Sequence, residues 1–249
     1  GQIKTHGGGA AVGVLDSDVG PYLEADLDTA GLAGFDPNGV SVSTAPLLHL
    51  LRTYRDLTGD GTYSSLATFL RNADVLDHLA ASSGLRADGL LTELDEYQNH
   101  YLPGTADDIL ARFRSNTLTD ELPADRLTNL RRGVQQVATL APVSSREPVE
   151  TRIRRFLQTV FAHRELEHGS PDDDAFRASA ELVDETLQAS TESSLRDLGF
   201  ADDEILGLLL DHLGAARFTP QRPRNAIDLE GWLELQWNDA PHIVVAGMN

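Results

Sequence analysis

The sequence of 249 residues contains no cysteine and a single lysine, Lys4. Without cysteine, the chain can form neither disulfides nor thiolate active sites, and it offers no cysteine ligand to a metal. A P-loop needs Gly-Lys-Ser/Thr directly after a strand, and Lys4 follows Ile3 with no strand before it. Schiff-base and lysine-base mechanisms have no candidate apart from Lys4. These two shortages exclude several large classes of enzyme.

Long apolar runs are also missing. No run approaches the roughly 20 apolar residues of a membrane span, so we expect no membrane association. The start, GQIKTHGGG, has neither an initiating methionine nor the apolar stretch of a signal peptide, and it is typical of an artificially added start or of an internal segment. Together with the lack of cysteine, these features predict a cytoplasmic protein.

Positive charge is scarce. The chain has 20 basic and 39 acidic residues, which gives a formal net charge of −19. Such a field repels nucleic acid and anionic lipid at long range. Any contact with DNA must therefore come from a local basic patch.

The two ends of the sequence have the pattern of an α/β layer. Residues 10–15 predict a strand, and residues 19–31 predict a helix that stops at Gly31. A turn at 36–39 (Asp-Pro-Asn-Gly) precedes a short alternating strand at 40–43. Strand signals return at the other end, in AIDLEGWLEL (226–235) and PHIVVAGMN (241–249). The last of these is apolar on both faces, which is typical of a buried central strand covered by helices.

Between these ends the apolar residues recur every three or four positions, as in amphipathic helices. No fixed repeat period is visible, so a solenoid is not predicted. The expected helices are residues 46–57, 63–72, 73–82, 90–102, 106–116, 124–140, 149–167, 172–190 and 201–216.

This change of period predicts an α/β fold with a large all-α insertion. We expect residues 1–45 and 217–249 to form a split α/β domain, with a parallel sheet layer assembled from both chain ends. Residues 46–216 would form the inserted helical subdomain.

Catalytic and metal-binding patterns fail on spacing. His163 and His168 are five residues apart, so they lie about 140° apart around a helix, whereas a zinc helix needs histidines at i and i+4. Asp172–Asp174 follow Ser-Pro at an expected helix start, where acids complement the helix dipole. They could also begin a nuclease signature, but its later Asp/Glu-x-Lys cannot be completed with one lysine. The sequence contains no Gly-x-Ser-x-Gly elbow. We expect no catalytic residue, no metal and no cofactor.

Two arginine clusters are candidates for phosphate contact. The helical run at 152–155 contains three arginines, which we expect to pair with the plentiful carboxylates. The second cluster, Arg217, Arg222 and Arg224, lies in a stretch without acids just before the strands return. We predict these three as the nucleic-acid-binding residues. If they engage three phosphates of single-stranded DNA, the salt slope of binding is about −2.

The stretch RNAIDLEGWLELQWNDAPHIVVAGMN (224–249) resembles a segment of the AddB/RecC-like helicase–nuclease proteins, AddB-type members of the PD-(D/E)XK nuclease family. In that family a comparable strand ends in Gly-Met/Phe-Asn before Glu-Gly and Pro, and Gly247, Met248 and Asn249 match the first part. Residues 11–51 resemble the segment that opens the second helicase-like domain: a strand, a helix and then TAP-LL. The helical middle matches mainly in its position as an insertion.

The resemblance implies a helicase-like module that has lost its ATPase motifs, cut from a longer protein that processes DNA ends in double-strand break repair and recombination. The parent would be an exonuclease or helicase-type hydrolase whose nuclease domain lies downstream. The implied partners are single-stranded or duplex-end DNA, contacted through the parent protein, and a helicase partner subunit. This segment itself would not be catalytic, and it would scaffold or guide DNA.

Two alternatives remain open from the residues. The chain could be an acidic helical protein-interaction module unrelated to DNA, which its net charge of −19 favours. It could also be a small complete enzyme with an unrecognised site, which its residue inventory disfavours.

Overall fold

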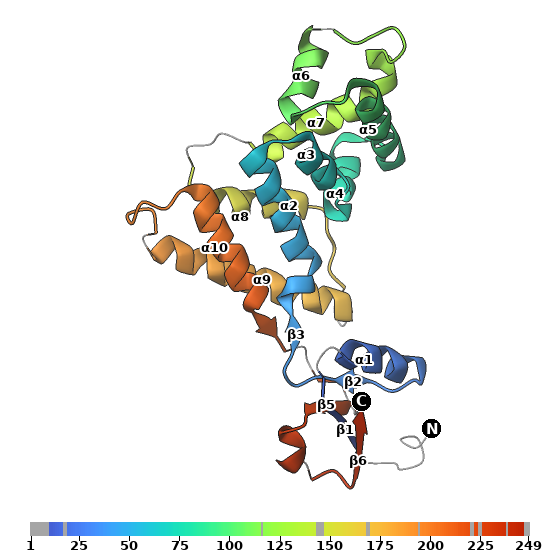
Figure 1. The fold of residues 1–249 in the computed structure, drawn as a ribbon, viewed down its shortest axis with the longest axis vertical. Helices are drawn as coiled ribbons and strands as arrows, with labels where there is room; N and C mark the ends of the chain where they lie inside the picture. Colours follow the sequence, from blue (N-terminus) through green and yellow to red (C-terminus); the bar gives the residue numbers. More distant parts are fainter. Residues whose placement is uncertain are drawn as a thin grey trace. The chain divides into compact units, whose positions relative to one another are not determined.

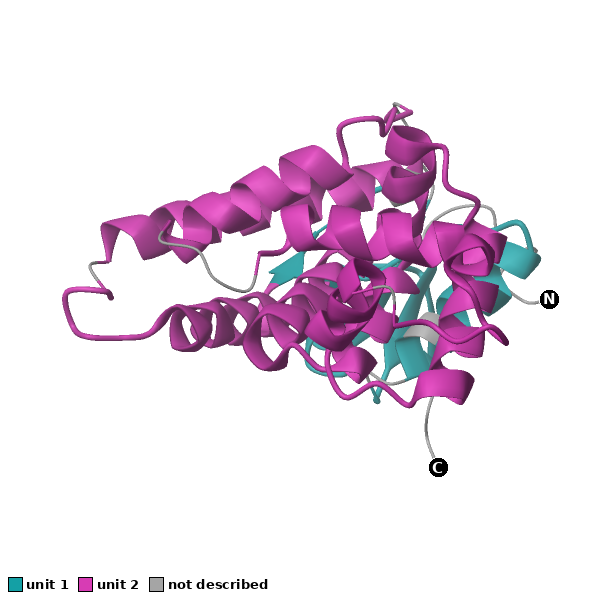
Figure 2. Cartoon of the chain, turned by 90° about the horizontal axis from the view of Figure 1, so that it is seen from above, with its two compact units in different colours: residues 1–41, 217–249 teal, residues 42–216 magenta. Residues whose placement is uncertain are grey.

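A computed structural model describes residues 10–16, 19–115, 117–142, 147–167, 170–193, 195–219, 222–223, 226–237 and 239–246 (Figure 1). The chain divides into two compact units, drawn in different colours in Figure 2. Residues 1–41 and 217–249 form the first, called the α/β unit below, and residues 42–216 form the second, called the helical unit.

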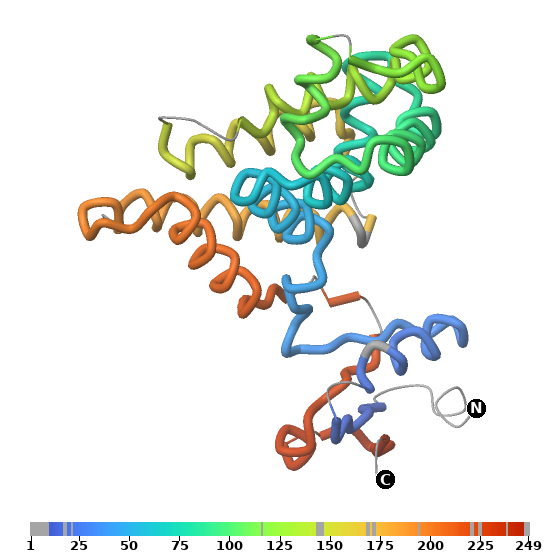
Figure 3. The backbone as a smooth tube through the Cα atoms, turned by 45° about the horizontal axis from the view of Figure 1, so that its top comes forward, coloured from blue at the N-terminus to red at the C-terminus, as the bar shows by residue number. Residues whose placement is uncertain are grey.

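The α/β unit is built around a four-stranded parallel sheet with the order β2-β5-β1-β6. Its strands are β1 (Ala10–Val14), β2 (Gly34–Phe35), β5 (Ile227–Gly231) and β6 (His242–Ala246). β1 lies between β5 and β6, with Val12 opposite both Leu229 and Val244. Figure 3 shows these blue and red segments side by side. The expected mixed α/β fold, with a parallel sheet made by both chain ends, is therefore confirmed.

One face of this sheet packs against helix α1 (Gly20–Thr29). Leu27 of α1 is buried with Val12, Ile227 and Leu229, so the contact joins β1, β5 and α1 in one apolar cluster. Burial of each such side chain contributes roughly 1.5–3 kcal/mol. The helix ends before Gly31, whose φ of 72° is favourable only for glycine, as the sequence predicts for its C-terminal stop.

The expected strand at 40–43 is shorter in the structure. β3 (Val40–Ser41) pairs antiparallel with β4 (Arg217–Phe218), a short strand that the sequence analysis missed. From Val42 to Thr44 the chain forms a 3-10 turn, η3, instead of a strand. The reason is local: Ala45 N donates to Val42 O at 2.9 Å, which turns the chain into helix α2.

The expected strand at 226–235 also ends early, at Gly231. The following residues turn, and Glu234–Trp237 form the 3-10 turn η5. Leu235 of this turn packs so closely on Gly13 of β1 that a Cβ atom at Gly13 would collide with it. Leu235 can cover the sheet face at Gly13 only if the chain turns after Gly231, and β5 therefore ends there.

The prediction that residues 243–246 form a buried central strand is wrong. β6 lies at the edge of the sheet, and Ile243, Val244 and Val245 are 38–45% exposed. Apolar composition on both faces identified a strand correctly. It could not show that no described strand pairs with its outer side.

The helical unit contains α2 (Pro46–Asp60), α3 (Tyr63–Leu70), α4 (Ala73–Ser83), α5 (Ala87–Tyr101), α6 (Ala106–Ser115), η4 (Ala124–Leu127), α7 (Thr128–Leu140), α8 (Val149–Val160), α9 (Pro171–Glu192) and α10 (Asp202–Ala215). These confirm the expected helices, although the first four residues of the helix expected at 124–140 form the 3-10 turn η4 and one other helix is shorter than expected. The helix expected at 149–167 ends at Val160, because Arg164 N bonds to Phe161 O and the chain turns there.

The core of the helical unit centres on an aromatic group. The ring of Phe156 lies 4.6 Å from that of Tyr54 and 5.8 Å from that of Phe69, and all three side chains are at most 1% exposed. This contact joins α2, α3 and α8. Within the described part of the chain, no helix is both long enough and apolar enough to cross a membrane.

Candidate functional site

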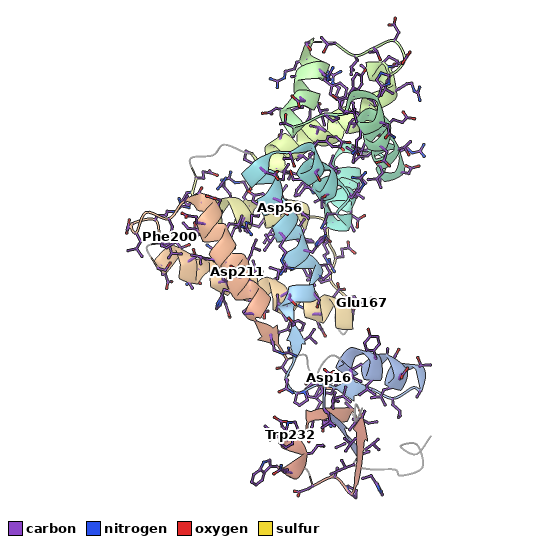
Figure 4. The ribbon with its side chains drawn as sticks, in the orientation of Figure 1. Asp16, Asp56, Glu167, Phe200, Asp211 and Trp232 are labelled. Atoms are coloured by element: carbon purple, nitrogen blue, oxygen red, sulfur yellow. The ribbon has the colours of Figure 1, made fainter. Side chains whose placement is uncertain are left out.

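Parallel sheets of this kind bind ligands at the carboxyl ends of their strands, because the loops that follow those strands converge there. In the α/β unit, β1 leads into Asp16, β2 into Asp36 and β5 into Trp232. Figure 4 labels Asp16 and Trp232 on these loops. The carboxyl edge therefore presents carboxylates and an indole that is 56% exposed.

Arg217, the first predicted nucleic-acid-binding residue, lies on β4 and holds the turn at 36–39. Its Nε donates to Asn38 O at 2.8 Å, and its Nη2 donates to Gly39 O. The same Nη2 lies 3.8 Å from the carboxylate of Asp36. Its side chain is 50% exposed, but its donors are directed at its own unit.

Gly39 shows why this turn needs its sequence. Its φ of 77° disfavours other residues, and a Cβ atom there would collide with the carbonyl of Phe218. Asp36 Oδ1 accepts from Asn38 N at 2.8 Å, which closes the turn. The turn Asp-Pro-Asn-Gly thus allows β3 to pair with β4, and the hydrogen bonds of Arg217 hold the turn in place.

Arg222, the second predicted residue, is paired more tightly. Its Nε lies 2.8 Å from Asp228 Oδ1 and its Nη2 3.1 Å from Oδ2, which is bidentate geometry. Nη2 also donates to Ala226 O at 2.9 Å. The hydrogen bond to Asp228, followed by that residue's negative charge, raises the pKa of the Arg222 guanidinium.

The remaining sequence-predicted residues, Arg224, Gly247, Met248 and Asn249, lie outside the described part of the chain. The structure brings Arg217 and Arg222 into the same unit. The sequence around these arginines lacks acidic residues, but the fold places Asp36 beside Arg217 and Asp228 beside Arg222. A phosphate would have to compete with these carboxylates, so the pairing weakens the basis of the predicted patch. DNA binding by these residues stays a prediction.

The other arginine cluster behaves as the sequence suggests. Arg152 pairs with Asp202 at 2.7 Å, Arg154 with Asp184 at 2.9 Å and Arg155 with Glu147 at 2.6 Å. The expectation that these helix-face arginines pair with carboxylates is confirmed.

His163 does not take part in a metal site with described residues. Its ring stacks on that of His78 with centroids 6.5 Å apart, and His168 lies outside the described part. Among the residues that the structure describes, no group of three or more His, Asp or Glu could hold a metal ion. Asp173, at the start of α9, accepts from Glu167 N at 2.9 Å and pairs with Arg164 at 3.0 Å. It therefore stabilises the chain where it enters α9.

Sequence reasoning missed a buried charge network in the helical unit. Glu150 is 4% exposed, and its carboxylate accepts from Ser190 Oγ at 2.9 Å and Arg196 Nη2 at 3.2 Å. Arg196 also pairs with Asp202 at 2.9 Å, which in turn pairs with Arg152. Burial on its own raises the pKa of Glu150, but hydrogen bonds from its own backbone, Ser190 and Arg196 give a net lowering. The network joins α8, α9 and α10.

Nothing in the local sequence would have revealed this network, since the contacts of Glu150 and Arg152 with Ser190, Arg196 and Asp202 span 40 to 50 positions. The exposed turn after β5 was within reach of sequence reasoning. Both tryptophans of the chain, Trp232 and Trp237, lie there and are 56% and 85% exposed. Two tryptophans within six residues of each other, next to acidic residues, are unusual for a chain with so few aromatics.

No protein-family model matches the chain, and no curated protein matches it.

Proposed function

We propose that this chain is a non-catalytic, helicase-like segment of a cytoplasmic protein that processes DNA ends, and that it serves as a scaffold within that protein. The observation that carries the proposal is the split α/β unit. One parallel sheet takes β1 and β2 from the N-terminal end and β5 and β6 from the C-terminal end, and a helical unit occupies the sequence between them. This organisation is what the resemblance to the second helicase-like domain of AddB-type proteins implies.

A scaffold role is favoured over direct DNA contact by the charges. Arg217 and Arg222 are turned toward carboxylates and carbonyls of their own unit. With a net charge of −19, the chain repels a phosphate backbone at distances beyond such a patch.

The test has two parts. In the first, the chain is assayed for ATP hydrolysis and for DNA cleavage with magnesium; we expect neither, because Lys4 cannot complete either motif. Turnover above a matched blank that persists through rigorous repurification contradicts the proposal.

In the second part, labelled single-stranded and duplex-end DNA are titrated at low and moderate salt with the wild-type chain and with the Arg217→Ala, Arg222→Ala, Arg224→Ala triple variant. The scaffold role predicts no binding by either protein. Binding that the triple variant loses, with a salt slope of about −2, assigns the segment to guiding DNA instead. Equal DNA binding by both proteins excludes the three arginines as the DNA-binding site.

The second candidate function is an acidic protein-interaction module unrelated to DNA. The specific observation in its favour is the turn with exposed Trp232, Leu233 and Trp237, since exposed aromatics in a polar setting are typical of protein interfaces. The two candidates differ in partner: the first belongs to a DNA-processing assembly, whereas the second binds a protein outside it.

A further inference from the structure

The helical unit contains an open cleft along one side of helix α9. Its volume is about 430 Å³, which lies within the usual range for ligand-binding clefts. Six of its lining residues lie between positions 176 and 185 of α9, so the cleft follows nearly three turns of this helix. The lining residues all belong to the helical unit and are Leu166, Phe176, Arg177, Ala180, Glu181, Asp184 and Glu185.

The apolar lining of the cleft is held in place by packed neighbours. The ring of Phe176 packs edge-to-face on that of Phe161, with centroids 4.8 Å apart, and the guanidinium carbon of Arg164 lies 4.0 Å from the Phe176 centroid. Arg164 also pairs with Asp173 of α9 at 3.0 Å. These contacts fix the segment that carries Leu166 against α9, where Leu166 is 42% exposed. The cleft thus presents apolar surface on a well-packed base.

The charged lining contains two acids that no described cation neutralises. Arg177 pairs with Asp174 at 2.6 Å, and Asp184 is already the partner of an arginine of α8. Among the described residues, no basic side chain forms an ion pair with Glu181 or Glu185. These two are four positions apart on α9, and like charges at this spacing destabilise a helix. The pair is therefore unfavourable for α9 alone and becomes favourable when a cation binds beside it.

We propose that this cleft is a docking site for an amphipathic helix of a partner protein, with an apolar row of side chains and a basic row beside it. The apolar row packs on Leu166, Phe176 and Ala180, and the basic row pairs with Glu181 and Glu185. Docking of an amphipathic helix in an apolar groove is a recurring mode of recognition. An extended segment fits less well, because the side of a helix offers it no free main-chain groups, whereas a helix satisfies its own.

Charge selects the class of partner. A basic helix is attracted by the field of a chain with a net charge of −19, and an acidic partner is repelled. A second copy of this chain is disfavoured for the same reason. The inference is separate from the proposed role at DNA ends, because no residue of the cleft belongs to the α/β unit.

The test uses the full chain and three capped, fluorescently labelled peptides, each with four repeats of a four-residue unit. In the first peptide the unit is Leu-Arg-Ala-Ala, which places the arginine row about 100° from the leucine row around a helix. In the second peptide the unit is Leu-Ala-Arg-Ala, which has the same composition and charge but places the rows about 200° apart. The third peptide has the unit Leu-Glu-Ala-Ala. Binding is followed by anisotropy at physiological salt.

Two double variants of the chain are compared. Glu181→Arg with Glu185→Arg reverses the charge of the cleft. Asp56→Arg with Asp211→Arg changes the net charge by the same amount at exposed acids of α2 and α10 outside the cleft, which Figure 4 labels.

Docking in the cleft predicts that the first peptide binds and that the second binds at least about tenfold more weakly. The cleft double variant should weaken binding of the first peptide by at least about tenfold and should bind the third, glutamate-containing peptide instead. The control double variant should weaken binding of the first peptide by less than about threefold, because exposed charges at a distance are screened.

Three results overturn the proposal. They are no binding of the first peptide, equal binding of the two arginine peptides, or an equal loss of binding in the two double variants. The second and third results would mean that net charge alone attracts the peptide. Thermal melting of each variant checks that it is folded, and the comparison of the two arginine peptides uses only the wild-type chain.

Discussion

Removal of the Glu150 carboxylate tests whether the buried charge network stabilises the helical unit. In Glu150→Ala, Ser190 and Arg196 each lose a hydrogen bond to a charged acceptor. Such bonds contribute about 1.5–3 kcal/mol each, and removing one partner of a buried pair costs about 3–5 kcal/mol. The upper figures do not apply, because Arg196 is 41% exposed and keeps Asp202 as a partner. We therefore expect a loss of about 2–3 kcal/mol in the free energy of unfolding.

The same residue predicts a dependence on pH. The pKa of Glu150 in the folded chain is lowered from its ordinary value of 4.5. A carboxyl group with a lowered folded pKa stabilises the fold fully above its unfolded pKa, and this contribution is lost as the pH falls through the folded pKa. The difference in stability between wild type and Glu150→Gln should therefore shrink on moving from pH 7 to below the folded pKa. Glu150→Gln keeps the shape of the side chain and should cost about 1–2 kcal/mol at pH 7.

The assay is urea unfolding followed by far-UV circular dichroism at several pH values. Glu185→Ala, at an exposed position on α9, the helix that carries Ser190, is the control and should change stability by less than about 0.5 kcal/mol. A loss in Glu150→Ala no larger than that of the control, or a difference from Glu150→Gln that does not change with pH, refutes the reasoning.

Two further predictions concern single residues. His78 is buried beside His163, and burial, followed by the charge of His163, lowers its pKa. The unfolded chain therefore binds more protons than the folded chain near pH 6, and the free energy of unfolding should rise with pH through the ordinary histidine pKa of about 6.5. In pH-dependent melting, His78→Gln should flatten this rise. The control His49→Gln, at an exposed position, should leave the rise intact. Gly39→Ala should destabilise the α/β unit by about 1–2 kcal/mol, because its φ of 77° places a Cβ atom against the Phe218 carbonyl. Gly59→Ala, where a Cβ atom has open space, is the control in the same urea titration and should be neutral or slightly stabilising.

Local patterns predicted most of the elements because their causes are local. α2 begins at Pro46 and ends before Gly61, whose φ is 59°, and both residues mark these positions in the sequence. Asn72 caps α4 by accepting from Asp74 N at 3.0 Å, which is again a signal within three residues.

The sequence-based predictions failed where a contact between residues far apart in the chain determines the structure. β5 stops at Gly231 because Leu235 is needed over Gly13, more than 200 positions away in the chain. Arg217 is held by carbonyls of Asn38 and Gly39, 178 to 179 positions away, so an acid-free neighbourhood in sequence did not remain one in space. The apolar run of β6 specified a strand, but its place at the edge depends on which other strands exist.

The account rests on the claim that the helical unit is an insertion into a layer built by both chain ends. The direct test is to express residues 42–216 alone and to follow urea unfolding by far-UV circular dichroism beside the full chain. The ends of this segment already meet, since Val42 N donates to Ala216 O at 3.1 Å. We predict a helical, cooperative unfolding transition with a midpoint close to that of the helical signal in the full chain. A segment that is unfolded without residues 1–41 and 217–249 would contradict the insertion, and with it the observation on which the proposed function depends.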